Sequence, residues 1–175
     1  MKYPKNIYVA SVDPMHFSHL NTKKLAEKEL GEKVYLVICQ NELKNNSTFS
    51  LEERRRMAMG YLGDEEIYLA KGYAEIRKFF FYAKRVIRGF RDDSDFDYIK
   101  RLAKFYDVGN MEDKLCLISV PERLKNISSS KIKKLVRGGQ TKEAEKYCCA
   151  NVISKLQEKY AKEKLEAAGA TVELK

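Results

Sequence analysis

The sequence predicts an α/β fold: a single Rossmann-like domain with a doubly wound, parallel five-stranded sheet and a helical C-terminal end. Short apolar runs of strand length alternate along the chain with longer segments of helical spacing. The apolar runs are nearly continuous, as in KVYLVIC at residues 33–39, which is typical of strands covered on both faces. The 175 residues suit one domain with a substantial core.

The first strand and the first helix meet at a sharp turn. Residues 6–12 are an apolar run, and residues 17–30 have helical spacing that ends at Gly31. Pro14 disfavours helical geometry at the residue before it, so the chain breaks between the two elements. We expect the helix to use its leucines at positions 20, 25 and 30 as apolar anchors.

The remaining elements follow in regular alternation. The other strands are expected at residues 33–39, 66–70, 85–87 and 114–119. The other helices are expected at residues 50–61, 74–82, from Ser94 or Asp95 to about 107, 127–139, 142–147 and 151–167. Residues 40–49 read as a polar loop outside the core, and a capping box, Ser50 to Glu53, starts the helix after it. Residues 170–174 are predicted as an added edge strand.

Domain organisation and location follow from composition. With 44% hydrophobic and 34% charged residues the chain reads as globular, and we expect residues 1–175 to form one domain with helices of about 141–168 packed on it. No apolar stretch approaches the ~20 residues that span a bilayer. The N-terminus has no apolar signal core, so we expect a cytoplasmic protein.

The formal net charge is +9 and is unevenly distributed. Residues 141–175 hold seven lysines and six acidic residues, so the excess lies in the first 140 residues. This pattern is typical of a protein that binds a polyanion or several nucleotide phosphates. No Lys/Arg stripe with interleaved aromatic residues marks a track for single-stranded nucleic acid, and no specific nucleic acid is expected.

The four cysteines, at positions 39, 116, 148 and 149, have no CxxC spacing. Two lie in apolar strand-like runs and two are adjacent, which is a poor arrangement for disulfides or for zinc. We expect reduced cysteines that fill the core as small side chains.

Both histidines of the chain follow the first strand. His16 and His19 are three residues apart, which places them on one face of a helix start. A strand that ends where a helix begins leaves backbone N–H groups and a positive dipole end at one point, where α/β proteins hold phosphates. A single histidine there would read as a satisfied polar residue, but two together favour a functional site.

Two further polar clusters follow later strands. Arg88 and Arg91 flank a glycine after the fourth strand, and arginine forks suit pairs of phosphate oxygens, although pairing with nearby aspartates is an alternative. Ser128–Ser130 open a helix after the fifth strand, as an N-cap or an anion site. Lys44 lies in the polar loop after the second strand. Carboxyl ends of parallel strands face one crevice, so these residues should converge.

The combination of two histidines, two arginines, a lysine and a serine-rich helix start, with no candidate nucleophile, predicts direct phosphoryl-type transfer. A histidine that donates to a non-bridging phosphate oxygen binds more strongly as the transition state forms. The sequence has no Walker-A run and no GxGxxG after the first strand. A P-loop enzyme and a dinucleotide oxidoreductase are therefore disfavoured.

These segments resemble, in order along most of the chain, those of the HxGH nucleotidyltransferases. The matching segments are SVDPMHFSH at 11–19, a lysine loop before FSLEER at 49–54, VIRGFRDDSDFDY at 86–98 and ISSSKIKKLVRGG at 127–139. Each segment alone is weak, but four in register are specific. RGFR with the downstream DFDY favours the phosphopantetheine adenylyltransferase branch.

The resemblance implies transfer of AMP from ATP to the 4′-phosphate of phosphopantetheine, with Mg²⁺, giving dephospho-coenzyme A and pyrophosphate. The catalytic residues it implies are His19, Lys44 and Arg91. The implied acceptor-binding residues are Ser11, Lys44 and Arg88. The implied nucleotide-binding residues are Ser11, Val12, His16, His19, Gly89, Phe90, Arg91, Leu124, Ser128, Ser129 and Ser130. It implies no metal-ligating side chain, and a homo-oligomer, often a hexamer in the family.

Three substitutions lie in the first motif. Ser18 replaces its glycine, and Ala10 and Val12 replace the usual glycine and phenylalanine. These changes leave the residues that carry the chemistry in place. Ser18, where backbone should lie close to the nucleotide, is the best support for an alternative, a nucleotide or nucleic-acid binder without catalysis.

The acceptor region also departs from the family pattern. Ile99 stands where a glutamate is common, Tyr106 where asparagine is usual, and residues 72–75 match poorly. The acceptor therefore stays open between phosphopantetheine and another phosphate ester such as nicotinamide mononucleotide.

Overall fold

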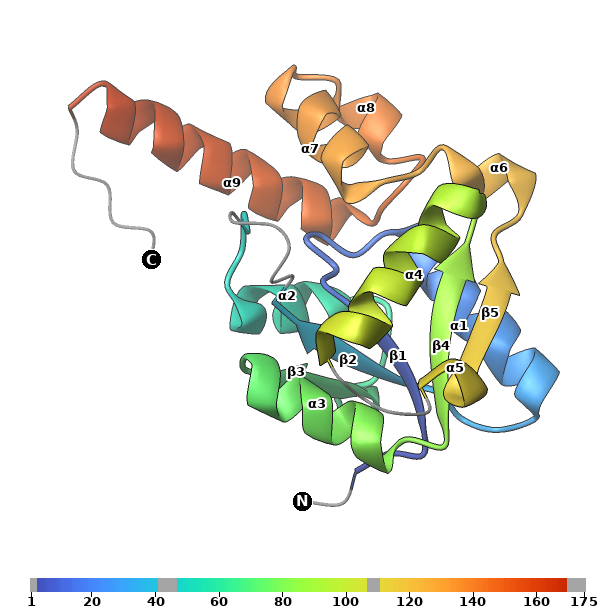
Figure 1. Ribbon diagram of the computed structural model, residues 1–175. Coiled ribbons are helices and arrows are strands. Elements are labelled where there is room, and N and C mark those ends of the chain that lie inside the picture. Colours follow the sequence, from blue (N-terminus) through green and yellow to red (C-terminus); the bar gives the residue numbers. More distant parts are fainter. Residues whose placement is uncertain (1–2, 41–46, 107–110, 170–175) are drawn as a thin grey trace.

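A computed structural model describes residues 3–40, 47–106 and 111–169 and contains one parallel sheet of five strands (Figure 1). The strand order is β3-β2-β1-β4-β5, with a crossover between β3 and β4, so the predicted doubly wound α/β fold is confirmed. The strands are β1 (Asn6–Ala10), β2 (Tyr35–Cys39), β3 (Ile67–Ala70), β4 (Arg85–Phe90) and β5 (Leu115–Ser119).

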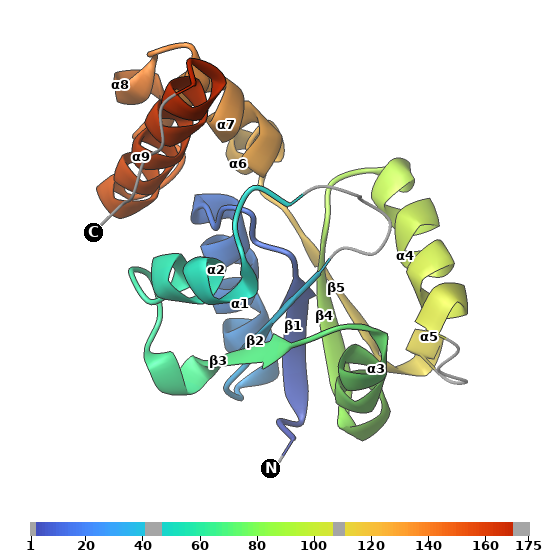
Figure 2. The same cartoon turned by 90° about the vertical axis from the view of Figure 1, so that its left-hand side faces the viewer.

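Helices cover both faces of the sheet (Figure 2). α1 (Phe17–Leu30) and α2 (Leu51–Ala58) lie on one face. α3 (Tyr73–Tyr82), α4 (Asp93–Tyr106) and the single turn α5 (Met111–Lys114) lie on the other. Because side chains alternate along a strand, neighbouring residues of β1 enter two separate apolar cores, one on each face.

The C-terminal third forms a helical layer at the carboxyl ends of the strands (Figure 1). It comprises α6 (Glu122–Lys125), α7 (Ser129–Arg137), α8 (Thr141–Ala144) and α9 (Ala150–Ala167). These helices share a third apolar core with Phe49 and Met57. Among the described residues, no helix has both the length and the apolar composition needed to cross a membrane.

Helix α1 has the predicted bounds and ends at Gly31 in the left-handed conformation, and its three predicted leucine anchors pack against the apolar core on this face of the sheet. The three leucines are only partly buried, and the fully buried positions are Ser18, Thr22, Lys23 and Ala26. Small side chains on this face allow the helix to approach β4 closely. A Cβ at Gly89 would lie 3.2 Å from Thr22 Oγ1, a tight contact that would require Thr22 to move by a few tenths of an ångström.

Other differences concern element boundaries and the predicted loop. β4 continues to Phe90, so Arg88–Phe90 belong to the strand and do not follow it. α4 begins at Asp93, which places Ser94 and Asp95 inside the helix and not at its cap. Phe49, assigned to a polar loop, is 3% exposed and belongs to the third core. The predicted edge strand at 170–174 lies outside the described residues.

The third core gives a test of the predicted single domain. Leu156 on α9 is fully buried, whereas Leu165 on the same helix is 47% exposed. We expect Leu156→Ala to lower the free energy of unfolding by ~2–5 kcal/mol, measured by urea titration as one cooperative transition. The control Leu165→Ala should change it by less than about 0.5 kcal/mol. A separate early transition of the C-terminal helices would contradict a single domain.

Candidate active site

A cleft of about 700 Å³ opens at the carboxyl ends of the strands, between β1, β4, α1, α4 and α7. The three polar clusters singled out in the sequence meet there, as the topology predicts. The predicted site residues that line it are Ser11, His16, His19, Arg88, Gly89, Arg91, Ser128, Ser129 and Ser130.

The histidine pair sits at the first turn of α1. The two imidazole rings are stacked, with centroids 3.7 Å apart. The backbone N–H of His16, the N-cap residue, donates to Nδ1 of His19 at 3.3 Å. Because Nδ1 accepts this bond, the ring proton of a neutral His19 is assigned to Nε2, which is the nitrogen left to act as a donor.

Both histidines are held neutral. Burial, followed by the positive charges of Arg91 and Arg88, lowers the pKa of His19 to about 3. Burial, followed by His19 and Arg91, holds the pKa of His16 well below its usual value. Beneath them, burial raises the pKa of Tyr8 to about 12, so its hydroxyl stays protonated on the cleft floor. Sequence reasoning missed Tyr8, because it assigned the whole apolar run to the core.

The two arginines reach the cleft from the end of β4 and the residue after it. Arg88 Nη1 donates to the carbonyl of Val9 at 2.6 Å. Arg91 makes a two-pronged contact with Asp95, Nε at 2.9 Å and Nη2 at 2.8 Å, so the predicted alternative of an aspartate pair is realised for this residue. The pair lowers the pKa of Asp95 and orients the Arg91 guanidinium, which is 42% exposed at the cleft.

The serine cluster starts α7 beside the loop that follows β1. Ser128 is the N-cap, and its Oγ accepts the Lys131 N–H at 3.2 Å. Ser129 Oγ donates to the carbonyl of Pro14 at 2.9 Å. The first turn of a helix directs backbone N–H groups outward, so this end of α7 is suited to an anion.

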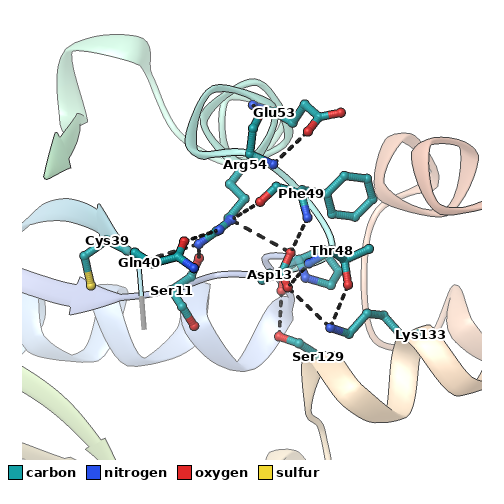
Figure 3. A network of polar contacts seen from close by, with 12 residues as sticks. Ser11, Asp13, Cys39, Gln40, Thr48, Phe49, Glu53, Arg54, Ser129 and Lys133 are labelled. Carbon is teal, nitrogen blue, oxygen red and sulfur yellow. Dashed lines mark hydrogen bonds and ion pairs between the residues drawn. The ribbon is translucent and has the colours of Figure 1, made fainter. Parts of the chain in front are cut away.

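A buried polar network that the sequence reasoning missed lies under one wall of the cleft (Figure 3). The Asp13 carboxylate accepts the backbone N–H groups of Thr48 at 2.9 Å and Phe49 at 3.1 Å. Arg54 Nε lies 3.8 Å from its Oδ1, and Lys133 Nζ lies 3.3 Å from its Oδ2. The only signal for this network in the sequence is the position of Asp13, an acidic residue between Val12 and Pro14 in a largely apolar segment.

Arg54 of α2 joins the ends of two strands to this network. Its guanidinium is 1% exposed and donates to the carbonyls of Ser11, Cys39 and Phe49, at 3.2, 3.2 and 2.8 Å. A buried cation with these acceptors and a carboxylate nearby is well satisfied. The capping box from Ser50 to Glu53, which starts α2, is present as predicted.

Some predicted site residues lie elsewhere. Val12 is 1% exposed in the core, with φ +40°, a strained conformation for a β-branched residue. Phe90 and Leu124 do not line the cleft in the described part of the chain, although Gly89 does. Lys44 lies outside the described residues.

The two single-residue departures from the family pattern in the acceptor region both lie on α4. Ile99 is buried, and Tyr106 lines the cleft beside Phe80, with ring centroids 5.0 Å apart. All four cysteines lie in the described part of the chain and none is in a disulfide there; Cys39 and Cys148 are buried, whereas Cys116 and Cys149 are partly buried.

The neutral histidines predict a pH-dependent stability. Histidine in an unfolded chain has a pKa of about 6.5. His19 in the folded protein has a pKa of about 3. Below pH 6.5 the unfolded state therefore binds more protons, and stability falls as pH falls.

We expect the free energy of unfolding of the wild type, relative to His19→Gln, to fall by up to about 1.4 kcal/mol per pH unit below pH 6.5. Urea titrations at pH 7 and pH 5 measure the difference. Subtracting the free energy of unfolding of the variant from that of the wild type removes the contribution of the carboxylates that both proteins share. Parallel pH dependence of the two proteins would show that His19 is not held neutral.

Comparison with known proteins agrees with this geometry. The cytidylyltransferase-like family model matches residues 7–135. A phosphopantetheine adenylyltransferase of Malacoplasma penetrans is 30% identical over 141 residues, covering 75% of this chain and 89% of the relative. Proteins of the same name from Blochmanniella pennsylvanica and Prochlorococcus marinus are each 27% identical, covering 76% and 77% of this chain and 78% and 87% of their own.

Among solved structures, Thermotoga maritima TmcAL bound with alpha-thio ATP has a TM-score of 0.58 at 12% identity. The match covers 93% of this chain and 56% of that one, and it shows a shared fold. The family match spans β1 to α7 and so includes every element that lines the cleft. The chain is a nucleotidyltransferase and belongs to the cytidylyltransferase-like family.

Proposed function

We propose that this protein transfers the adenylyl group of ATP to the 4′-phosphate of phosphopantetheine, forming dephospho-coenzyme A and pyrophosphate. The observation that carries the proposal is the convergence of neutral His19, two arginines and the start of α7 on one cleft. Relatives named phosphopantetheine adenylyltransferase, which match three quarters of the chain, support the choice of acceptor.

In the proposed reaction, an oxygen of the acceptor phosphate attacks the α-phosphorus of ATP in line with the bond to pyrophosphate. The new P–O bond forms as the bond to the leaving pyrophosphate breaks, so no covalent enzyme intermediate is required. Nε2–H of His19 donates to a non-bridging oxygen of the α-phosphate. This hydrogen bond is stronger in the transition state than in the ground state. It therefore lowers the activation barrier and accelerates the reaction.

The β- and γ-phosphates are assigned to the start of α7 and to Arg91. Ser128–Ser130 supply hydroxyl and backbone donors there, and Arg91 adds a fixed positive charge. The two cleft carboxylates, Asp13 and Asp95, are already paired with cations. Among the described residues, no group of three His, Cys, Asp or Glu side chains is suited to a metal ion. We therefore assign Mg²⁺ to the substrate, bound to the phosphates of ATP as in many nucleotide sites.

The acceptor phosphate is assigned to Ser11, Arg88 and Lys44, and the rest of the acceptor to the part of the cleft next to Tyr106. Arg88 lies on β4, adjacent to β1, and its contact with the Val9 carbonyl directs it to the strand ends. The wall formed by Tyr106 and Phe80 is aromatic. That observation favours a second candidate acceptor with a ring, such as nicotinamide mononucleotide.

Pyrophosphate release with MgATP and each acceptor in parallel tests the proposal. Release with 4′-phosphopantetheine alone is the expected result. Release with nicotinamide mononucleotide alone would keep the chemistry and replace the acceptor. No release with either acceptor, with ATP still bound, would favour the non-catalytic alternative.

The central role of His19 gives a sharper prediction. We expect His19→Ala to lower kcat by about 10²–10³-fold, because the ring donates to the reacting phosphate. Far-UV circular dichroism should remain unchanged. Lys24→Ala, an exposed position on the same helix, is the matched control and should retain normal turnover. A near-normal rate for His19→Ala would remove this residue from the mechanism.

A further inference from the structure

Lys133 is a cleft residue to which none of the roles above has been given. It lies four residues after Ser129 on α7, so helix geometry places both on one face. Helical side chains lean towards the N-terminus, which directs Lys133 towards the anion-binding turn. Its Nζ lies 3.3 Å from Asp13 Oδ2 and 3.0 Å from Thr48 Oγ1, and its side chain is 24% exposed.

Asp13 does not need Lys133 for charge balance. The carboxylate is 11% exposed and already accepts two backbone N–H bonds, and the buried guanidinium of Arg54 lies 3.8 Å away. The three charges therefore leave one positive charge in excess, and Lys133 is the more exposed of the two cations. The contact between Lys133 and Asp13 is therefore not required to neutralise the carboxylate, and its effect is to hold α7 against the loop after β1.

A second contact joins the same two segments. Ser129 Oγ donates to the Pro14 carbonyl, so α7 is tied to the loop after β1 at two points one helical turn apart (Figure 3). The same loop leads into α1, whose first turn carries His19. The distance between His19 and the start of α7 thus depends on these two ties.

We propose that Lys133, through its ion pair with Asp13, positions the first turn of α7 to bind the terminal phosphates of the nucleotide. The proposal rests on the proposed function only in that the cleft binds ATP. It makes Lys133 a positioning residue that acts on the β- and γ-phosphates and not on the adenosine or the α-phosphate.

The test compares ATP with AMP, which lacks the terminal phosphates. Isothermal titration calorimetry gives Kd for both nucleotides with the wild type and with Lys133→Met. We expect Lys133→Met to weaken ATP binding about tenfold and AMP binding less than about twofold. The fold should survive, because Asp13 keeps Arg54 as its counter-ion. Lys134→Met removes the same charge from an exposed position on the same helix and is the matched control.

Two further variants separate positioning from general charge. Lys133→Arg should restore most of the ATP preference, because it keeps a cation within reach of Asp13. Asp13→Asn should also reduce that preference, and adding Lys133→Met to it should cause little further loss, because both act through one contact. Thermal melting of each variant confirms that it is folded.

Several results would overturn the proposal. One is equal weakening of ATP binding and AMP binding by Lys133→Met, and another is a loss of ATP binding in Lys134→Met as large as in Lys133→Met. A third is additive loss of ATP binding when Asp13→Asn and Lys133→Met are combined. Additive loss would mean that Lys133 binds phosphate by itself. A wild type without preference for ATP over AMP would also overturn it. None of these measurements needs an acceptor or turnover, so a failure to release pyrophosphate would refute the proposed function separately.

Discussion

The buried carboxylate of Asp13 is the contact on which the arrangement of the cleft depends. It joins the loop after β1 to the backbone of Thr48 and Phe49, to Arg54 on α2 and to Lys133 on α7. A buried ion pair contributes little net stability, but removing one partner leaves the other as an unpaired charge in the protein interior. Asp13 therefore fixes where these segments lie, and its removal would leave the buried Arg54 without its carboxylate partner.

The second feature that determines the chemistry of the cleft is the environment of the histidines. Burial, followed by the positive charges of Arg91 and Arg88, lowers the pKa of His19 and holds it neutral, so its ring enters the proposed reaction as a neutral donor. Nucleotide phosphates would offset the positive charge of these arginines, while Nε2–H of His19 donates to a non-bridging oxygen that carries the negative charge of the transition state. Both arginines belong to the first 140 residues, which carry most of the positive excess.

The sheet and the convergence of the clusters could be predicted, because period, capping and strand order are local or topological properties of the sequence. The capping box of α2 and the Gly31 stop of α1 are examples. The partners of Asp13 could not, because Lys133 is 120 residues away in sequence and only folding brings them together. The leucines of α1 pack against the core as expected, but their spacing does not show that Thr22 is buried beside Gly89, because that contact joins α1 to a strand far along the chain.

The most direct test of the account is isotope exchange between pyrophosphate and ATP in the absence of any acceptor. Direct transfer requires the acceptor phosphate to be present before the bond to pyrophosphate breaks. The account predicts no exchange with ATP, Mg²⁺ and labelled pyrophosphate alone, and exchange once acceptor is added. Exchange without acceptor would reveal a covalent adenylyl-enzyme and contradict a cleft that acts by position and charge alone.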